Sequence, residues 1–127
     1  MNDLSIDHFE AWLKSYGAAW EAKDIAAFVS LFNPNAIYYW TPFEDPQKGH
    51  DEIGEAVAAA VATQTKIEFG ARVLYVEARL GAAHWTCAFN RQETGDRVRL
   101  DGIFVVQFSE DGSALSFREW WHSDEQK

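Results

Sequence analysis

The chain has 127 residues, of which 47 % are apolar and 15 % aromatic, which is enough for one domain with a sizeable core and argues against disorder. Acidic residues outnumber basic ones by 20 to 11, and no run of Lys or Arg occurs, so we expect no binding to nucleic acid and no binding to an anionic membrane. The single cysteine, Cys87, excludes an intrachain disulfide. The stretch 1–7 lacks the basic and apolar regions of a signal peptide, and we predict a cytoplasmic protein.

The first half of the chain has the periodicity of helices. Apolar side chains recur every three or four residues after Ser5, which predicts an amphipathic helix with Ser5 as its N-cap. Asp24 is the expected N-cap of a second helix, and Asn33-Pro34 is its expected end, because proline disfavours a helical residue before it. The predicted elements are helices over residues 5–22 and 24–33, a strand over 36–41 and a helix from about residue 49 to 64.

The second half of the chain alternates apolar and polar residues, which is the pattern of strands. The predicted strands cover residues 67–79, 83–92, 97–109 and 114–122, with turns at 80–81, 93–96 and 110–112. Gly95 and Gly112 are expected to supply the positive φ of two hairpins. Helices followed by long meandering strands predict an α+β fold, in which three N-terminal helices pack on a strongly curved antiparallel sheet that forms a cone with an internal pocket. We expect residues 1–127 to form one domain.

The order of these elements and several local motifs resemble the SnoaL-like, nuclear transport factor 2-like superfamily, which includes ketosteroid isomerases and polyketide cyclases. The motifs are Tyr16 eight residues before Asp24, the run Leu31-Phe32-Asn33-Pro34, Pro46 three residues before Gly49, the turn Asp111-Gly112 after Phe108, and the closing run from Arg118 to His122. The resemblance spans nearly the whole chain. It implies the cone fold and a homodimer that pairs through the outer face of the sheet, and it names no substrate.

The isomerases of this superfamily provide a comparison of chemistry. Motif spacing places Tyr16 at their oxyanion-stabilising tyrosine, but Trp40 at their general base and Phe104 at their second, protonated acid. Trp121 occupies the place of an aromatic residue of the pocket. Because indole and phenyl groups cannot abstract a proton, the resemblance implies the walls of the pocket without the isomerase acid–base pair.

Strand alternation places Glu119 on the face of Trp121, together with Leu115 and Phe117. A carboxyl group among apolar neighbours has a raised pKa and is suited to acid–base catalysis near neutral pH. We therefore predict Glu119 as a catalytic group, with Tyr16 as a hydrogen-bond donor. The alternative is a structural Glu119 that pairs with an arginine such as Arg72, Arg91 or Arg118.

His122 ends the last predicted strand, and we predict it as a third catalytic residue near the mouth of the pocket. Aromatic residues are expected to form a slot for a flat ligand: Trp20, Trp40, Trp85, Phe104 and Trp121. The alternative is that these side chains fill the cone. No two histidines have the spacing of a metal-binding pair and no phosphate-binding glycine motif occurs, so we expect neither a metal nor a cofactor.

The outer face of the sheet is predicted to be apolar at Ile103, Val105 and Trp120, which favours a homodimer through this convex face. Our leading hypothesis is a pocket protein of the SnoaL-like type that binds a small, mostly apolar molecule. An acid–base enzyme of isomerase, cyclase or lyase type fits this hypothesis. The alternative is a non-catalytic binding or dimerisation module, and the sequence leaves open whether the protein is an enzyme.

Overall fold

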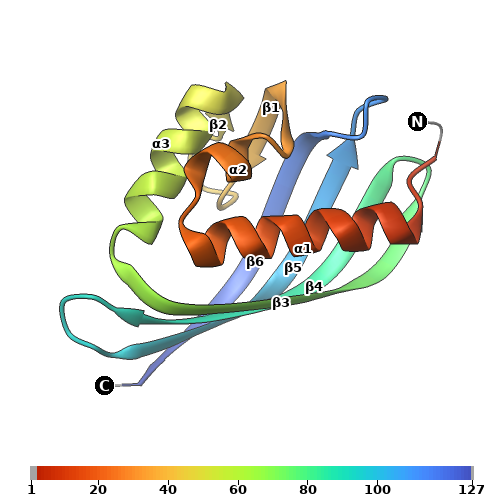
Figure 1. The fold of residues 1–127 in the computed structure, drawn as a ribbon. Coiled ribbons are helices and arrows are strands. Elements are labelled where there is room, and N and C mark those ends of the chain that lie inside the picture. The colour runs from red at the N-terminus through yellow and green to blue at the C-terminus, as the bar shows by residue number, and fades with distance from the viewer. Residues whose placement is uncertain (1–2, 127) are drawn as a thin grey trace.

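The computed structural model describes residues 3–126, so residues 1, 2 and 127 of the predicted domain lie outside the described residues. Helix α1 runs across one face of a sheet, and α2 and α3 lie toward one end of it (Figure 1). The elements are α1 (Ile6–Ala22), α2 (Ile25–Val29), β1 (Phe32–Tyr39), β2 (Gln47–Lys48), α3 (Gly49–Val61), β3 (Gln64–Glu77), β4 (Leu80–Arg91), β5 (Arg97–Phe108) and β6 (Ala114–Gln126).

The described strands form one six-stranded sheet in the order β2-β1-β6-β5-β4-β3. Strands β3 to β6 are the predicted antiparallel meander, and β1 pairs with β6 in parallel. The predicted α+β architecture of three helices on a curved sheet is confirmed, with one correction. The sheet is mixed rather than antiparallel throughout, and it does not close, because β2 and β3 are its two edges.

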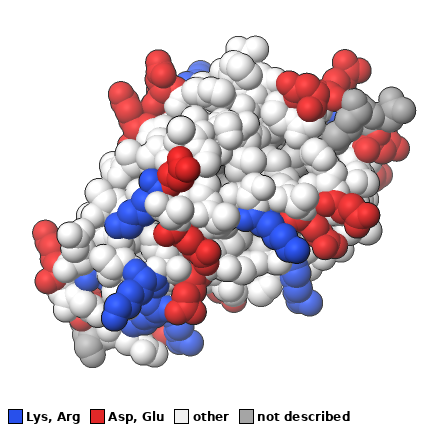
Figure 2. Space-filling view, viewed as in Figure 1, with Lys and Arg blue, Asp and Glu red and all other residues white. Residues whose placement is uncertain are grey.

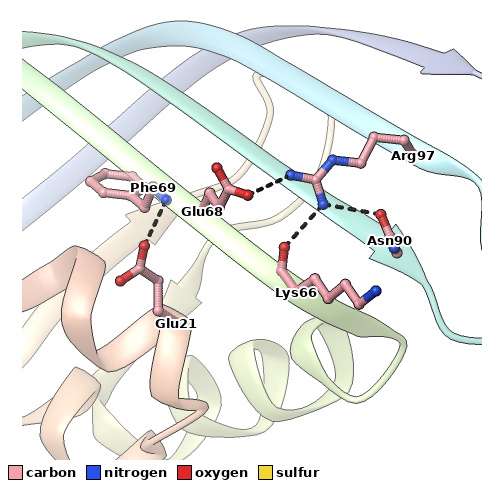
Figure 3. Close-up of polar contacts among 6 residues, drawn as sticks. All are labelled: Glu21, Lys66, Glu68, Phe69, Asn90 and Arg97. Atoms are coloured by element: carbon pink, nitrogen blue, oxygen red, sulfur yellow. Dashed lines mark hydrogen bonds and ion pairs between the residues drawn. The ribbon is translucent and has the colours of Figure 1, made fainter.

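Polar contacts from neighbouring elements stabilise the edge strand β3 where it bends (Figure 3). The register of β3 against β4 shifts around Lys66, whose φ is 51°. The guanidinium of Arg97 donates to the carbonyl oxygen of Lys66 at 3.0 Å and to Glu68 at 3.2 Å. On the same strand the Phe69 N–H donates to the Glu21 carboxylate of α1 at 2.8 Å. Polar groups that the bulge removes from the ladder are therefore satisfied, and the end of α1 is tied to the curved strand.

The core lies between α1 and the sheet. The predicted periodicity places Phe9, Trp12 and Tyr16 on the buried face of α1. Tyr16 stacks on Phe117 of β6 with ring centroids 5.4 Å apart, and meets Phe104 of β5 edge-on at 5.2 Å. These offset and edge-on contacts between aromatic rings add to the stabilisation that burial of their area provides.

The second helix is shorter than predicted. The side chain of Asp24 caps it as expected, accepting from the Ala27 N–H at 3.0 Å, but the helix ends at Val29. The carbonyl oxygen of Leu31 instead accepts from the Ala114 N–H of β6 at 3.0 Å, which starts the parallel pairing of β1. The irregular register between Phe32 and Ile37 accommodates the missing N–H of the proline within this strand.

The turn between β3 and β4 lies at residues 78–79, not at 80–81 as predicted. Ala78 supplies its positive φ of 51°. Gly81 is inside β4, where a Cβ would lie 2.6 Å from the ring of Phe9. Gly81 therefore allows α1 to approach the sheet closely. The sequence around Gly81 does not distinguish this role from that of a glycine in a turn. Gly95 and Gly112 have the expected positive φ of 75° and 88°.

Candidate functional site

A cavity of about 250 Å³ opens between the helices and strands β4 to β6. The structure brings six of the predicted site residues to its wall: Tyr16, Trp20, Trp40, Trp85, Glu119 and Trp121. They come from α1, from the segment after β1, and from β4 and β6. Apolar residues of α3, such as Val57 and Val61, complete the lining. Side chains separated by more than one hundred residues in sequence therefore share one aromatic cavity.

Phe104 lies behind this wall rather than in it. Its side chain is fully buried and stacks on Trp85, with ring centroids 4.8 Å apart and planes 12° apart. Tyr16 and Phe117 cover its other sides. Phe104 lies on the predicted face of the sheet, but it is not among the residues that line the cavity, because Trp85 and Tyr16 pack over it.

His122 lies on the opposite face of the sheet from the cavity. Strand β6 continues to Gln126, and Glu119, Trp121 and Ser123 alternate along its cavity side. His122 pairs in register with Asp101 and borders a groove of the other face. Neighbouring residues of a strand point to opposite faces, so Trp121 and His122 could not both face the cavity. The structure does not bring His122 to Glu119.

One residue of the predicted cavity face is displaced by a bulge. The register of β5 against β6 shifts so that Phe108 pairs with Ala114, and Gln107 with Ser116. Leu115 is the extra residue and is exposed, although alternation from Trp121 predicts it inside. From Phe117 onward the predicted alternation holds, which is the part of the strand that carries Glu119.

A chain of three hydrogen-bonded side chains ends at the carboxyl group of Glu119. The Tyr38 hydroxyl donates to Glu119 Oε2 at 3.2 Å, and it lies 2.8 Å from the Tyr16 hydroxyl. Because a tyrosine has one hydroxyl proton, Tyr16 is the donor to Tyr38. The sequence analysis did not select Tyr38. Only its parallel register beside Phe117 of β6 brings it to Glu119, and this non-local pairing has no local signal.

Glu119 has no arginine partner among the described residues, and the predicted alternative of a structural ion pair is wrong. Its neighbour Arg118 lies over the ring of Tyr39, 3.8 Å from the ring centre. Arg91 lines the cavity, but its guanidinium donates twice to Glu125, at 2.9 and 3.0 Å. The buried carboxyl group of Glu119 is therefore hydrogen-bonded to a tyrosine hydroxyl and is not paired with a cation.

Burial raises the pKa of Glu119 from 4.5 to about 8, and the hydrogen bond from Tyr38 opposes this rise only in part. The same burial, together with the nearby Glu119 carboxyl, raises the pKa of both Tyr16 and Tyr38 well above 10. At neutral pH the chain of three groups is therefore uncharged. A protonated Glu119 accepts from Tyr38 and still has one O–H to donate.

Outside the cavity, the described residues form neither a metal-ion cluster nor an activated thiol. Within residues 3–126, no three His, Cys, Asp or Glu side chains gather closely enough to hold a metal ion. Burial raises the pKa of Cys87 to about 12, which disfavours a reactive thiolate. On the face seen in Figure 2, Lys and Arg side chains lie beside Asp and Glu rather than in a continuous basic patch. None of the helices in this part of the chain is long and apolar enough to cross a membrane.

The fold and cavity define a member of the cone-shaped α+β class, and comparison with known proteins identifies the family. The SnoaL-like domain family matches residues 13–117, and the chain belongs to it. This confirms the resemblance that the sequence motifs indicated. No curated protein matches the chain by sequence.

Solved structures share the fold at low sequence identity. A putative isomerase from Bacillus subtilis is 21 % identical, with a TM-score of 0.76 over 91 % of this chain and 88 % of that chain. A hypothetical protein with a ketosteroid isomerase-like fold from Catenulispora acidiphila, in complex with trimethylamine, is 12 % identical, with a TM-score of 0.76 over 86 % of this chain and 83 % of that chain. The epoxide hydrolase/cyclase-like enzyme SalBIII of salinomycin pyran-ring formation is 20 % identical, with a TM-score of 0.75 over 89 % of each chain.

The raised pKa of Glu119 predicts a pH-dependent stability. Between about pH 4.5 and pH 8 the folded protein retains a proton that the unfolded chain releases, so the free energy of unfolding falls as the pH rises, by up to about 1.4 kcal/mol per pH unit. Glu119→Gln has no such proton. Urea unfolding across this pH range is expected to show Glu119→Gln gaining stability relative to wild type as the pH rises, with no further gain above the folded pKa.

The control is Glu44→Gln, which removes one negative charge from an exposed position. A stability difference between Glu119→Gln and wild type that stays constant with pH, or follows that of the control, would contradict the buried neutral carboxyl.

Proposed function

We propose that the cavity binds a small, mostly apolar molecule and that Glu119 acts on it as a general acid. The observation that carries this proposal is a carboxyl group in an aromatic cavity with no cation beside it, whose pKa burial raises to about 8. A group that is protonated at neutral pH but close to titration is suited to transfer a proton. The relatives that are described as isomerase and cyclase-like enzymes, and the relative that holds trimethylamine, support a binding cavity in this fold.

The hydrogen-bond chain stabilises the negative charge on Glu119 after this group releases its proton. The carboxylate that remains accepts from Tyr38, and Tyr38 accepts from Tyr16. Hydrogen bonds to an ionised group are stronger than those to a neutral one, and more so in a cavity that excludes water. Tyr16 and Tyr38 therefore act as positioning residues that moderate the cost of ionising Glu119.

Glu119 is the one carboxyl group among the described residues of the cavity wall. Trp40 lies at the cavity where the isomerase comparison expects the general base, and it cannot remove a proton. We therefore propose chemistry that a single carboxyl group can perform, donating a proton and recovering it in the same cycle. Isomerisation, cyclisation and elimination are reaction types that meet this condition.

The described residues of the cavity wall include neither a second carboxyl group nor a histidine, and this favours a second candidate function. A neutral carboxyl group can serve as a hydrogen-bond donor that orients a ligand without any proton transfer. The protein is then a non-catalytic binding module with the same cavity. The two candidates differ only in the fate of the bound molecule.

Replacement of Glu119 by glutamine separates these functions, because an amide keeps a donor but has no proton to transfer. We expect some members of a panel of flat apolar compounds to raise the melting temperature of wild type and of Glu119→Gln by several degrees at saturating concentration. For an enzyme, chromatography and NMR show conversion of a bound compound by wild type and at least hundredfold slower conversion by Glu119→Gln. Binding without conversion by either protein supports the binding module, and a panel without any thermal shift contradicts the proposal.

We also propose that the single domain of residues 1–127 is a cytoplasmic homodimer that pairs through the outer face of the sheet. Trp120 is 47 % exposed on this face, next to Ile103 of β5 in the register. A large exposed indole on a sheet face is typical of an interface. The hydrogen bond between His84 and Asp101 and the ion pair between Arg99 and Asp124 lie on the same face and supply polar groups that would fix the register of two copies.

Light scattering tests the homodimer directly. Wild type is expected at twice the chain mass of 14.4 kDa, and Trp120→Glu at the monomer mass, because the carboxylate would be desolvated in the interface. Leu74→Glu is the matched control, since Leu74 is also 47 % exposed but lies on the edge strand β3. A monomeric wild type, or a Trp120→Glu variant that remains dimeric, would contradict this interface.

A further inference from the structure

The indole N–H of Trp85 is buried without a hydrogen-bond partner among the described residues. The side chain is 1 % exposed, and its ring lies against Trp20, Phe69 and Phe104. A buried donor that makes no hydrogen bond is costly, and native proteins rarely leave one without a reason. Trp85 belongs to the cavity wall, so an occupant of the cavity is the natural source of the missing acceptor.

Gly102 creates the space that this N–H occupies. Gly102 stands between Trp85 of β4 and Trp121 of β6 in the register of three adjacent strands. A Cβ on Gly102 would lie 2.1 Å from the carbonyl oxygen of Trp120, 2.9 Å from Trp85 Nε1 and 2.9 Å from the Cβ of Trp121. The Trp120 oxygen borders the same place but makes no hydrogen bond with the Trp85 indole. The indole nitrogen therefore lies over the glycine, in a gap that is bordered by Trp121.

Among the aromatic side chains around this gap, Trp121 has the fewest aromatic contacts to hold it in place. It is 41 % exposed, whereas Trp85 is almost fully buried. Trp20, Trp40 and Trp85 each contact another aromatic ring, but Trp121 has no such contact within residues 3–126. A rotation of the Trp121 side chain therefore breaks no aromatic stack among these residues, and its Cβ borders the same place over Gly102 as Trp85 Nε1.

Gln64 offers a second donor to the same cavity. The indole N–H of Trp20 donates to Gln64 Oε1 at 2.8 Å. Because an indole N–H can only donate, this bond fixes the orientation of the amide and commits its oxygen. Gln64 is buried in the cavity wall, and its NH₂ group can donate a hydrogen bond to a ligand.

We propose that Trp85 Nε1 is a second ligand anchor of the cavity, uncovered by movement of Trp121, and that it takes a hydrogen-bond acceptor of a small apolar molecule. This inference rests on the proposed binding function and adds to it the class of ligand. The polar groups of Trp85 and Gln64 are donors, as is the O–H of Glu119 when protonated. The cavity therefore selects oxygen acceptors, such as carbonyl or ether groups, over ammonium groups, which can only donate.

Three bicyclic compounds of nearly equal shape test the anchor: 1-indanone has a carbonyl acceptor, indane has no polar group, and 1-aminoindane at neutral pH has an ammonium donor. The measurement is the ¹H–¹⁵N spectrum of the tryptophan indole groups in wild-type protein, with Trp85 assigned through the labelled backbone. We expect 1-indanone to move the Trp85 indole proton downfield and to shift the Trp121 signals. Indane and 1-aminoindane are expected to leave the Trp85 proton without a downfield shift.

Affinity provides a readout that separates the anchor from the cavity. Trp85→Phe is expected to weaken the binding of 1-indanone about fivefold more than it weakens the binding of indane, because 1-indanone alone loses a hydrogen bond. Because the wild-type spectrum carries the first test, a variant that fails to fold does not decide the outcome. If 1-indanone and indane bind with the same response at Trp85, the anchor is wrong while the binding cavity stands. If none of the three compounds binds, both the anchor and the proposed binding function are contradicted.

Discussion

The rest of the site depends on the burial of one carboxyl group among aromatic rings. Glu119 is 5 % exposed, and its hydrogen-bond donor is a tyrosine rather than an arginine or lysine. Taking a charged carboxylate out of water without a cation is unfavourable enough that the group keeps its proton. The proposed proton donation follows from this neutral carboxyl, and its O–H joins the donors of Trp85 and Gln64 in the proposed selection of acceptor groups.

The fold provides that environment through curvature. Strands β3 to β6 bend beneath α1 (Figure 1). Residues of one face of these strands line the cavity, while the strands stay paired except at their bulges. The contacts of Arg97 and Glu21 satisfy the backbone of β3 where it bulges. Gly81 and Gly102 allow Phe9 and Trp85 to approach the backbone. The cavity is thus a consequence of where the sheet bends and where side chains are missing.

The sequence predicts those parts of the site that local periodicity controls. Alternation along one strand places Glu119 and Trp121 on the same face, and helical spacing directs Tyr16 toward them. Tyr38 could not be found in this way, because its position depends on the parallel pairing of β1 with β6. The bulge at Leu115 is equally invisible, since one extra residue reverses alternation without a distinctive sequence. Phe104 shows a third limit: periodicity predicts a face, but not which of two stacked rings meets the cavity.

The most direct test of the account is the titration of the Glu119 side-chain carboxyl by ¹³C NMR in protein labelled at glutamate. The Glu119 signal is identified by its loss in Glu119→Gln. The account predicts an apparent pKa near 8, and a further rise in Tyr38→Phe, because the hydrogen bond that favours the ionised form is gone. A Glu119 that titrates near 4.5, the ordinary value for this side chain, would contradict the account.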